Sequence, residues 1–552
     1  MKLAWSLFLL TVLSLRSARL GAQTSAEDIA KPPAANWLSY SGDYSGRRFS
    51  TLEQINRDNV ANLAPQWVFH VPDSNHLEST PIVVDGIMYV TNSNEVYALD
   101  ALTGRAIWHY KYSRAKISNA NRGAAVLGDR LFFVSSDAHL IALNRKTGSL
   151  LWQVQYADAN KGYGASLAPL AIKDKVIVGV SGGECGIRGY IDSYEAASGK
   201  HAWRFWTIPG RGEPGSETWG GQPAEYSGGA TWMTGTYDPV ENTVFWASGN
   251  PGPNFYAGTR PGDNLYSNSL LALDAATGTR RWYFQFTPHD THDWDAEEVP
   301  VVLDTTFQDS PRKLILHADR NGFFYVLDRN NGQMLLGKPF VKKLTWAHGI
   351  LPNGRPDKIP GMDAAPNGKL VCPGAIGATN WFSPSFNPQT GLFYVMSVER
   401  CDVYTSSIAP FTKGTCYSGT GVDQIPAEPG QFVLRAIDIQ TGSIRWQKPL
   451  VNHVFSGAAM PGTLSTAGNL LFFADDSGYI AAADARSGDT LWHFYTGQFI
   501  ASSPITYSVG GRQFVEVTSA TDVFSFGLFE PSRPVAQPVD RKSSSPPSSE
   551  GV

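Results

Sequence analysis

The sequence predicts an all-β protein built as an eight-bladed β-propeller with tryptophan docking motifs, and three features support that fold. A hairpin phrase containing tryptophan recurs along the chain, turn-forming Gly and Pro are frequent, and aromatic residues suited to short strands are abundant. The 552 residues include 54 Gly, 35 Pro, 16 Trp, 22 Tyr and 28 Phe. Hydrophobic residues make up 42% and charged residues 17% of the chain, which excludes a disordered or fibrous protein.

The recurring phrase is a strand, a polar turn ending in glycine, and a second strand whose tryptophan lies four residues beyond that glycine. Asp or Asn caps the turn, Gly accepts the positive φ, and the Trp can cover the gap between adjacent sheets. Several copies lie roughly 50 residues apart, about the length of a four-stranded blade. Because the interval after Trp282 is longer, the repeat is compatible with either seven or eight blades. The copies end at Trp108, Trp152, Trp203, Trp282, Trp446 and Trp492, a copy over 326–336 lacks the tryptophan, and Gln66-Trp67 marks an early strand.

The two ends of the chain lack this pattern. Lys2 precedes an apolar run from Leu3 to Leu15 that is too short to span a bilayer, and Leu20-Gly21-Ala22 is a small-residue cleavage pattern. We expect residues 1–22 to be a secretory signal peptide, with an uncleaved anchor as the alternative. We expect a propeller domain over 23–530 and no later membrane span. Residues 531–552 are rich in Pro and Ser, which predicts a disordered tail.

Charge and cysteine content narrow the functional classes. The net charge is −4 with no basic bias, which argues against nucleic-acid binding. No Cys-x-x-Cys-His occurs, so the chain carries no covalent c-type haem of its own. Four cysteines are too few for a disulfide scaffold, but export to an oxidising compartment permits one or two bridges.

Two glycine-rich segments carry polar residues that blade packing does not require. Ser181 to Gly189 reads SGGECGIRG, where two glycines let the backbone approach a ligand while Glu184 points at it. Asn250 lies at a strand end in a Gly/Pro loop, where its amide oxygen can bind a hard cation. Taken singly, each also fits an ordinary turn with a polar surface residue.

The segment FTPHDTHDWDAEEVP, from Phe286 to Pro300, concentrates acidic residues. Asp293 and Asp295 share a face if the segment is extended, and two such carboxylates repel unless a cation lies between them, so a metal is predicted. His289 and His292 leave zinc open, but no Cys or third His lies nearby in sequence, and carboxylate oxygens favour a hard ion.

A fourth motif, HADRNGFFYVLDR, contains Arg320 directly ahead of an expected strand. Its planar guanidinium can form a fixed fork to a carboxylate or a quinone oxygen. A surface ion pair is the structural alternative for an isolated arginine.

Together these motifs resemble the quinoprotein alcohol dehydrogenases, the methanol and ethanol dehydrogenase family that uses pyrroloquinoline quinone (PQQ). The resemblance runs from about Asn36 to Gly527 and covers the hairpins and the order and spacing of the four motifs. It implies a propeller that holds PQQ beside one metal ion and oxidises primary alcohols to aldehydes by hydride transfer to metal-bound PQQ. It also implies a periplasmic enzyme that passes electrons to a separate c-type cytochrome; association into a homodimer stays open.

The resemblance assigns a role to each motif residue. Glu184, Asn250 and Asp293 match metal ligands, and Asp293 also matches the catalytic base. Arg320 matches the catalytic arginine that contacts the quinone oxygens, and Trp232 matches the tryptophan that stacks on the PQQ ring. The other residues that match the PQQ pocket are Glu78, Arg122, Ser166, Ser181, Gly182, Gly183 and Asn380.

Asp295 bears on the identity of the metal. In the family, an Asp two residues after the catalytic Asp is typical of lanthanide-using members, whereas calcium-using members carry a small residue there. A trivalent ion of nearly calcium's size is held better by one more anionic oxygen. We therefore expect Asp295 to be a metal ligand and the ion to be a lanthanide, with Ca²⁺ as the alternative.

The cysteines depart from the family in part. Many members carry adjacent cysteines against the PQQ plane, where this chain has Lys116-Ile117-Ser118-Asn119-Ala120. Cys372 and Cys401 match a disulfide of the family. Cys185 and Cys416 have no clear partner, and we interpret Cys185 as a small buried side chain.

Two other functions are left open by the sequence. A PQQ enzyme acting on sugars or polyols would share the same cofactor site. A non-catalytic propeller of the outer-membrane assembly type would share the hairpins, but it gives no reason for Glu184, Asn250, Asp293, Asp295 and Arg320 to occur together.

Overall fold

The computed structural model describes residues 23–529 except 75, 114–119, 414, 425–429, 451–460 and 476. The expected signal peptide (1–22) and tail (531–552) lie outside the described residues, as does nearly all of the segment that replaces the adjacent cysteines. Within the described ranges, no helix is both long enough and apolar enough to cross a membrane.

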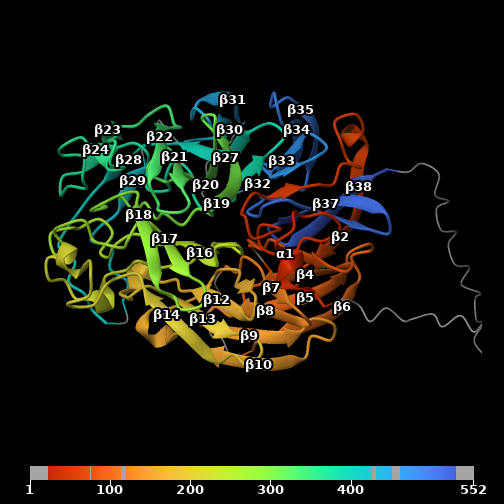
Figure 1. Cartoon of the computed structure of the whole chain (residues 1–552), viewed down its shortest axis with the longest axis horizontal. Coiled ribbons are helices and arrows are strands. Elements are labelled where there is room, and N and C mark those ends of the chain that lie inside the picture. Colours follow the sequence, from red (N-terminus) through yellow and green to blue (C-terminus); the bar gives the residue numbers. More distant parts are fainter. Residues whose placement is uncertain are drawn as a thin grey trace, which may run out of the picture.

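The described chain forms eight sheets of four or five strands, which follow one another around the molecule in sequence order (Figure 1). The all-β prediction is thus confirmed. The first four sheets consist of β3 (Ile82–Val84), β4 (Ile87–Asn92), β5 (Glu95–Asp100) and β6 (Ala106–Lys111); β7 (Ala125–Leu127), β8 (Arg130–Val134), β9 (His139–Asn144) and β10 (Leu150–Gln155); β11 (Leu170–Ile172), β12 (Lys175–Gly179), β13 (Tyr190–Glu195) and β14 (His201–Trp206); and β15 (Thr236–Asp238), β16 (Thr243–Ala247), β17 (Ser269–Asp274) and β18 (Arg280–Gln285).

The last four sheets continue the series and close it. The fifth contains β19 (Val301–Phe307), β20 (Ser310–Ala318), β21 (Phe323–Asp328) and β22 (Met334–Pro339), and the sixth β26 (Ser385–Asn387), β27 (Leu392–Glu399), β30 (Gln431–Asp438) and β31 (Ile444–Pro449). The seventh contains β32 (Thr463–Thr466), β33 (Leu470–Ala474), β34 (Tyr479–Asp484), β35 (Thr490–Tyr495) and the parallel strand β1 (Phe49–Ser50), and the eighth β36 (Ile505–Val509), β37 (Arg512–Ser519), β38 (Asp522–Leu528) and β2 (Leu63–His70).

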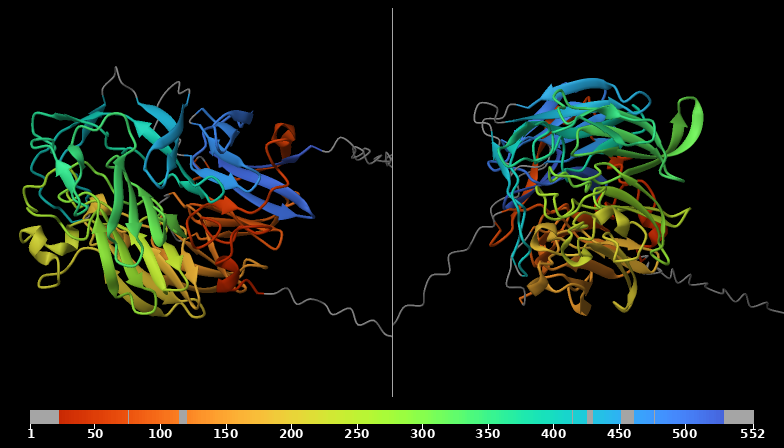
Figure 2. Two further views of the ribbon diagram at one scale, coloured as in Figure 1. Left: turned by 45° about the horizontal axis from the view of Figure 1, so that its top comes forward. Right: turned by 90° about the vertical axis from the view of Figure 1, so that its left-hand side faces the viewer.

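The ring closes through a strand from the start of the chain. β2 pairs antiparallel with β38, so that Leu63 lies opposite Leu528 and His70 opposite Asp522. The red start and the blue end of the described chain therefore lie side by side (Figures 1 and 2). This pairing satisfies the backbone groups of what would otherwise be a free sheet edge.

Smaller elements connect or extend the sheets. The insertion between the fifth and sixth sheets and the connection between β27 and β30 together contribute β23 (Ala347–Ile350), β24 (Pro356–Lys358), β25 (Lys369–Val371), β28 (Asp402–Tyr404) and β29 (Val422–Gln424). They account for much of the long interval between Trp282 and Trp446. The described helical elements are α1 (Ala26–Ile29), η1 (Val60–Asn62), η2 (Ala159–Lys161), η3 (Gly183–Cys185), η4 (Ser216–Trp219) and η5 (Ala224–Tyr226).

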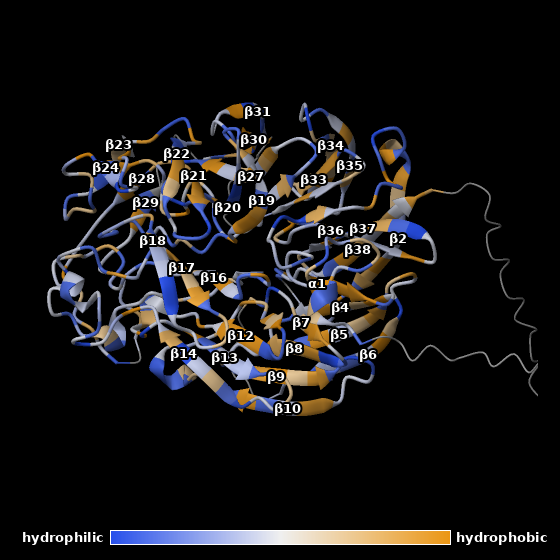
Figure 3. Ribbon diagram, in the orientation of Figure 1, coloured by the Kyte–Doolittle hydropathy of each residue, from blue (hydrophilic) through white to orange (hydrophobic). Residues whose placement is uncertain are grey.

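Burial follows strand position within each sheet. Middle strands such as β8, β9, β33 and β34 are largely buried, whereas outer strands such as β6 and β31 alternate exposed and half-buried residues. In Figure 3, hydrophobic residues gather on strands such as β4 and β5, and hydrophilic residues lie on many of the connections. Sheets covered on both faces need apolar side chains on both faces, which explains the near-continuous apolar runs.

The repeated tryptophans contact the neighbouring sheet. Each indole Nε1–H donates a hydrogen bond of 3.1 to 3.3 Å to a backbone oxygen beyond its own sheet. In most copies the turn glycine packs against the ring of the tryptophan from the preceding copy. A Cβ at Gly278, for example, would lie 2.5 Å from the Trp203 ring. The donors and acceptors are Trp67 and Ala101, Trp108 and Arg145, Trp152 and Ala196, Trp203 and Ala275, Trp282 and Arg329, Trp446 and Ala485, and Trp492 and Leu63.

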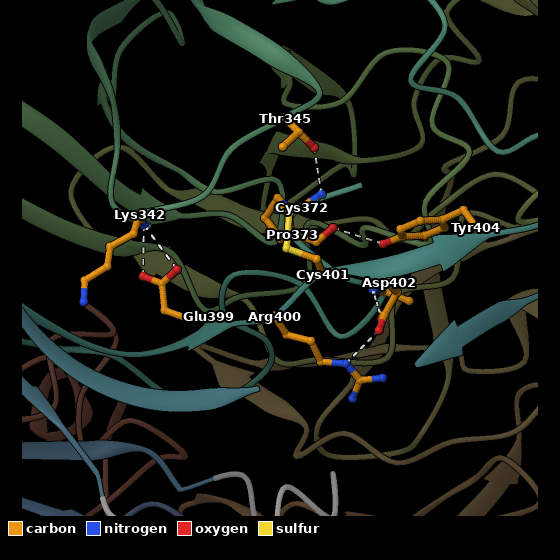
Figure 4. The surroundings of a disulfide bond; sticks show 10 residues. Lys342, Thr345, Cys372, Pro373, Glu399, Arg400, Cys401, Asp402 and Tyr404 are labelled. Carbon is orange, nitrogen blue, oxygen red and sulfur yellow. Dashed lines mark hydrogen bonds and ion pairs between the residues drawn. A yellow bond between two sulfur atoms is a disulfide. The ribbon is translucent and has the colours of Figure 1, made fainter. Parts of the chain in front are cut away.

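The expected disulfide between Cys372 and Cys401 is confirmed. Figure 4 shows it between β25 and β28, with the Cys372 amide donating to Thr345 Oγ1 at 2.9 Å. Close by, Arg400 Nε donates to Asp402 Oδ1 at 2.8 Å. The bridge joins the insertion to the connection that follows β27, with a sequence separation of 29 residues.

Candidate functional site

A cavity of about 550 Å³ gathers most of the predicted site residues. They all come from segments that connect strands, so they are positioned by the sheets without being part of their repeat. The predicted residues that line the cavity are Arg122, Ser166, Ser181, Gly182, Gly183, Glu184, Trp232, Asn250, Asp293, Asp295 and Arg320.

Glu78 and Asn380 do not line the cavity but contact residues that do. Glu78 forms an ion pair with Arg122, with 2.6 Å between Oε2 and Nη2. Asn380 Oδ1 accepts a hydrogen bond from Arg320 Nη2 at 3.1 Å. The structure therefore brings all thirteen predicted residues into one connected group.

The segment between β18 and β19 positions Asp293 through a tight local turn. Asp290 accepts hydrogen bonds from the backbone N–H groups of His292 and Trp294, both at 2.9 Å. Asp293 has a φ of 65°, a left-handed conformation that non-glycine residues adopt at a cost. Arg320 Nη1 donates to the Asp293 carbonyl at 3.0 Å and fixes this conformation from the opposite side.

Asp295 accepts two hydrogen bonds from other site residues and forms an ion pair with a third. Its Oδ1 accepts from the backbone N–H of Asn250 at 2.7 Å, and its Oδ2 accepts from Trp232 Nε1 at 3.1 Å. Arg320 Nη2 lies 3.0 Å from the same Oδ2. Asp295 thus holds the Asn250 loop, the Trp232 ring and the Arg320 guanidinium in one arrangement.

The Glu184 turn depends on glycine. Gly182 has a φ of 106°, and a Cβ there would lie 2.0 Å from the Gly162 carbonyl oxygen. The 181–183 backbone can therefore approach the 162–164 segment, with which Ser181 pairs through Gly164. This close approach places η3, which carries Glu184, at the cavity wall.

Cys185 and Cys416, which had no clear partner in the sequence analysis, form a disulfide with each other. The interpretation of Cys185 as a lone buried side chain is therefore wrong. The pair spans 231 residues, so no local spacing could have revealed it. It ties the residue next to Glu184 to the segment between β28 and β29.

Asn254 is a site residue that the sequence reasoning missed. Its Nδ2 donates to Asp293 Oδ1 at 2.6 Å, and its side chain also hydrogen-bonds Glu184. Its position four residues after Asn250 in the same Gly/Pro loop was the available signal.

Two buried acidic residues, Glu298 and Asp319, lie near Arg320 and were also missed. Glu298 Oε1 is 3.9 Å from Arg320 Nε, and Glu298 Oε2 is 3.5 Å from His317 Nε2. His317 Nε2 also lies 3.3 Å from Asp319 Oδ2. The sequence signal was the run AEE directly after Asp295, read there only as part of an acidic segment.

The electrostatics of the cavity favour a bound cation. Burial, the Asp295 charge and the Glu184 charge raise the pKa of Asp293 well above its usual value. Burial and Asp295 likewise raise the pKa of Glu184. Burial opposes the charge of Arg320, yet Asp295, Glu298 and Asp293 raise its pKa overall. One guanidinium therefore does not neutralise three neighbouring carboxylates.

The donor set fits a hard metal ion. Glu184, Asp293 and Asp295 offer carboxylate oxygens and Asn250 an amide oxygen, which are the ligands that calcium and lanthanide ions prefer. The two histidines of the acidic segment bond elsewhere: His292 Nε2 lies 2.8 Å from the Met362 carbonyl oxygen, and His289 Nδ1 lies 2.8 Å from that of Gly262. Zinc ligation by these histidines has no support here.

The part of the cavity around Trp232 and Arg122 fits a planar anionic molecule such as PQQ. The guanidinium of Arg122 lies 4.9 Å from the Trp232 ring centre and 4.5 Å from that of Trp381. Arg122 is 6% exposed, and its Nε and Nη1 have no hydrogen-bond partner among the described residues. Buried donors of this kind are costly unless a ligand accepts from them.

Comparison with known proteins agrees with this geometry. The family model for the β-propeller domain of PQQ-dependent glucose, ethanol and alcohol dehydrogenases matches residues 37–339 and 415–515. The quinoprotein alcohol dehydrogenase PedH of Pseudomonas putida is 37% identical over 92% of this chain and 90% of that protein. The lanthanide-dependent methanol dehydrogenase of Methylorubrum extorquens is 33% identical over 92% of this chain and 90% of that protein.

Solved structures lead to the same class. A europium-containing methanol dehydrogenase superimposes with a TM-score of 0.85 and 30% identity, over 91% of this chain and 100% of that one. The ring of sheets is therefore a β-propeller of the PQQ-binding kind. The chain belongs to the family of PQQ-dependent quinoprotein alcohol dehydrogenases.

Proposed function

We propose that this protein oxidises primary alcohols to aldehydes with PQQ and one bound metal ion. The observation that carries the proposal is the single cavity in which Trp232, Arg320 and the oxygen donors of Glu184, Asn250, Asp293 and Asp295 meet. The similarity to the alcohol dehydrogenase PedH and to the lanthanide-dependent methanol dehydrogenase supports it.

Glu184, Asn250, Asp293 and Asp295 would hold the metal ion. Three carboxylates bring more negative charge than a divalent ion needs, which supports a lanthanide over Ca²⁺. Asp295 supplies the third of these charges, and its Oδ1 also holds the Asn250 loop in place.

The remaining pocket residues would hold PQQ. Trp232 offers a flat face, and the guanidinium groups of Arg122 and Arg320, which lie 4.9 Å and 5.7 Å from its ring centre, offer cationic donors. Glycines at 182 and 183 let backbone N–H groups approach the cofactor, and Ser166 and Ser181 add hydroxyl groups. Glu78 would keep Arg122 oriented, and Asn380 would do the same for Arg320.

Asp293 would accept the hydroxyl proton of the alcohol. Its carboxylate becomes a competent base once a cation offsets the repulsion from Glu184 and Asp295, because the cation lowers its pKa. Arg320 would stabilise negative charge that develops on an oxygen in the cavity. When bound, PQQ supplies the two-electron acceptor and the metal ion supplies Lewis acidity.

We extend the proposal to the localisation of the protein, its electron acceptor and its blades. We propose that residues 1–22 direct the protein to the periplasm and that a separate c-type cytochrome accepts the electrons, because the chain has no Cys-x-x-Cys-His of its own. We also propose that the eight sheets are eight propeller blades and that the tryptophan hydrogen bonds dock each blade on the next.

Reconstitution tests the proposal directly. The purified chain is supplied with PQQ and either LaCl₃ or CaCl₂, and dye reduction is followed with ethanol, glucose or glycerol as substrate. We expect turnover of ethanol with La³⁺ and PQQ, and none when either is omitted. Activity with Ca²⁺ alone would overturn the metal preference, and turnover of glucose or glycerol but not ethanol would favour the sugar or polyol alternative.

A further inference from the structure

The segment from Thr405 to Gly421, between β28 and β29, lies against the candidate metal site. We refer to it as the brace. Its described residues contact two separate loops, the Glu184 turn and the loop that carries Asn250 and Asn254. These two loops supply half of the proposed metal ligands.

The brace is fastened to the Glu184 turn by adjacent bonds. The Cys185–Cys416 disulfide bonds the residue after Glu184 to the brace. The next brace residue, Tyr417, donates its backbone N–H to the Glu184 carbonyl at 2.7 Å. The Tyr417 hydroxyl donates to the Tyr226 carbonyl. The backbone of Glu184 therefore has partners on the brace that do not involve its carboxylate.

Aromatic packing also holds the brace against the Glu184 turn. The Phe411 ring stacks on the Tyr226 ring at 4.4 Å with an interplanar angle of 11°. Phe411 also covers Gly186, where a Cβ would lie 2.1 Å from the ring. The glycine after Cys185 thus leaves room for the brace to close over the turn.

The brace residues directly after Tyr417 contact the Asn250 loop. Phe255 donates its backbone N–H to the Ser418 carbonyl at 2.8 Å. Gly419 lies so close to Tyr256 that a Cβ would be 2.7 Å from the tyrosine Cβ. Asn254, adjacent to this contact, donates to Asp293. The brace is therefore connected to the surroundings of Glu184, Asn250 and Asp293.

We propose that the Cys185–Cys416 disulfide, together with Phe411 and Tyr417, positions Glu184 and the Asn250 loop for metal binding. The inference rests on the proposed function, because it assumes that these loops hold an ion. Neither cysteine need touch the ion, so both are positioning residues. A cross-link formed before binding lowers the ordering that the two loops must undergo when the ion enters, and so increases affinity.

Terbium luminescence measures the effect without turnover. Tb³⁺ has a lanthanide's charge and size, and tryptophan excitation sensitises its emission at short range; Trp232 Nε1 lies 3.1 Å from Asp295 Oδ2. The full-length protein is titrated with TbCl₃ as wild type and as the double variant Cys185→Ser with Cys416→Ser. We expect the dissociation constant to rise by about 10- to 100-fold, as for other residues that orient metal ligands.

The second disulfide supplies the matched control. The double variant Cys372→Ser with Cys401→Ser also loses one bridge but leaves the brace attached, so its Tb³⁺ affinity should stay within about twofold of wild type. Equal weakening in both double variants, or none in the 185/416 variant, would overturn the inference. If the 185/416 variant does not fold, Phe411→Ala should still weaken Tb³⁺ binding by several-fold, and wild-type affinity there counts against the brace.

The proposed function can fail separately. Asp295→Ala should abolish most of the sensitised emission of the wild type. If Asp295→Ala and the wild type bind Tb³⁺ alike, the ion lies elsewhere, and both the proposed site and the brace are wrong. If Asp295→Ala loses binding while the 185/416 variant keeps wild-type affinity, the site stands and only the brace is wrong.

Discussion

The ring of sheets and the cavity use the same kinds of residue in different ways. In the ring, each repeated tryptophan donates to a backbone oxygen of the neighbouring sheet, as Trp203 does to Ala275. In the cavity, Trp232 donates to the Asp295 side chain, which also accepts a hydrogen bond from the backbone N–H of Asn250. The ring depends on contacts that recur with the repeat, whereas the cavity depends on side chains that occur once.

This difference separates stability from chemistry. A side chain that packs between sheets contributes buried area and one hydrogen bond to folding. A carboxylate in the cavity works against folding, because Glu184, Asp293 and Asp295 repel one another until a cation arrives. Substitutions in the two regions should therefore have opposite consequences for unfolding and for turnover.

The largest expected effect is on turnover, from Asp293→Asn. The amide cannot accept the alcohol proton, so kcat should fall by about 10²- to 10⁴-fold in the enzyme loaded with PQQ and La³⁺. Dye-linked rates with ethanol measure the change. A variant with wild-type kcat would exclude Asp293 as the base.

The stability of the same variant gives the control. The raised pKa of Asp293 means that the folded metal-free protein binds this proton more tightly than the unfolded chain does. The charge therefore costs stability at neutral pH and costs nothing below about pH 4, where both states are protonated. Asp293→Asn should raise the melting temperature of the metal-free protein at pH 7 but not at pH 4, and a lower value at pH 7 would contradict this sign.

A matched pair of tryptophans gives the next largest effect. Trp203 is 6% exposed and packs on Gly278, so Trp203→Ala should destabilise the protein by about 3–5 kcal/mol in urea unfolding. PQQ affinity of the folded fraction should not change, because Trp203 does not line the cavity.

Trp232→Ala should show the reverse pattern. Losing the flat face should weaken PQQ binding by about tenfold, measured by quenching of protein fluorescence, with a smaller change in the free energy of unfolding than Trp203→Ala. Two variants with the same profile would mean that the ring and the cavity are not separable in this way.

The ring was the more predictable of the two regions. The hairpin phrase is local, and its turn glycines and tryptophans lie within a few residues of each other, so periodicity alone identifies them. The copy over 326–336 is recognisable without its tryptophan, and Leu336, which stands at the tryptophan position, is buried, as are Trp67, Trp203 and Trp492. The closing pair of β2 and β38 joins residues more than 400 positions apart, and only the tryptophan at position 67 hinted at it.

The cavity was predictable residue by residue but not as a network. The motifs of Glu184, Asn250, Asp293 and Arg320 identified side chains, yet their bonding partners come from distant loops. The Cys185–Cys416 bridge was missed because contacts over 231 residues leave no spacing pattern. Asn254 was missed because an asparagine in a Gly/Pro loop has a sufficient turn explanation by itself.

That missed asparagine provides a smaller test of the cavity network. Asn254→Ala removes the 2.6 Å hydrogen bond to Asp293 and the contact with Glu184. We expect La³⁺ affinity to fall by about tenfold, as for other residues that orient metal ligands. Calorimetric titration measures it. Asn387→Ala, which alters a buried asparagine of β26 away from the cavity, should leave that affinity unchanged.

The smallest expected effect concerns a carboxyl in the ring itself. Glu516, in β37, is fully buried, and neither oxygen has a hydrogen-bond partner among the described residues. Burial raises its pKa well above the usual value, although Arg48 opposes this. Unlike the cavity carboxylates, Glu516 does not belong to the proposed metal site, so no bound cation would stabilise its charge.

Glu516→Gln should therefore stabilise the protein at neutral pH by on the order of 1 kcal/mol. The folded protein favours the protonated carboxyl, so Glu516 costs no stability below the pKa of the unfolded chain, and its cost grows as pH rises above that value. The gain from the amide should appear in urea unfolding at pH 7.5 and vanish at pH 4, with turnover unchanged. Glu53→Gln, at an exposed position, should show no such difference, and an equal gain there would mean that net charge and not burial is responsible.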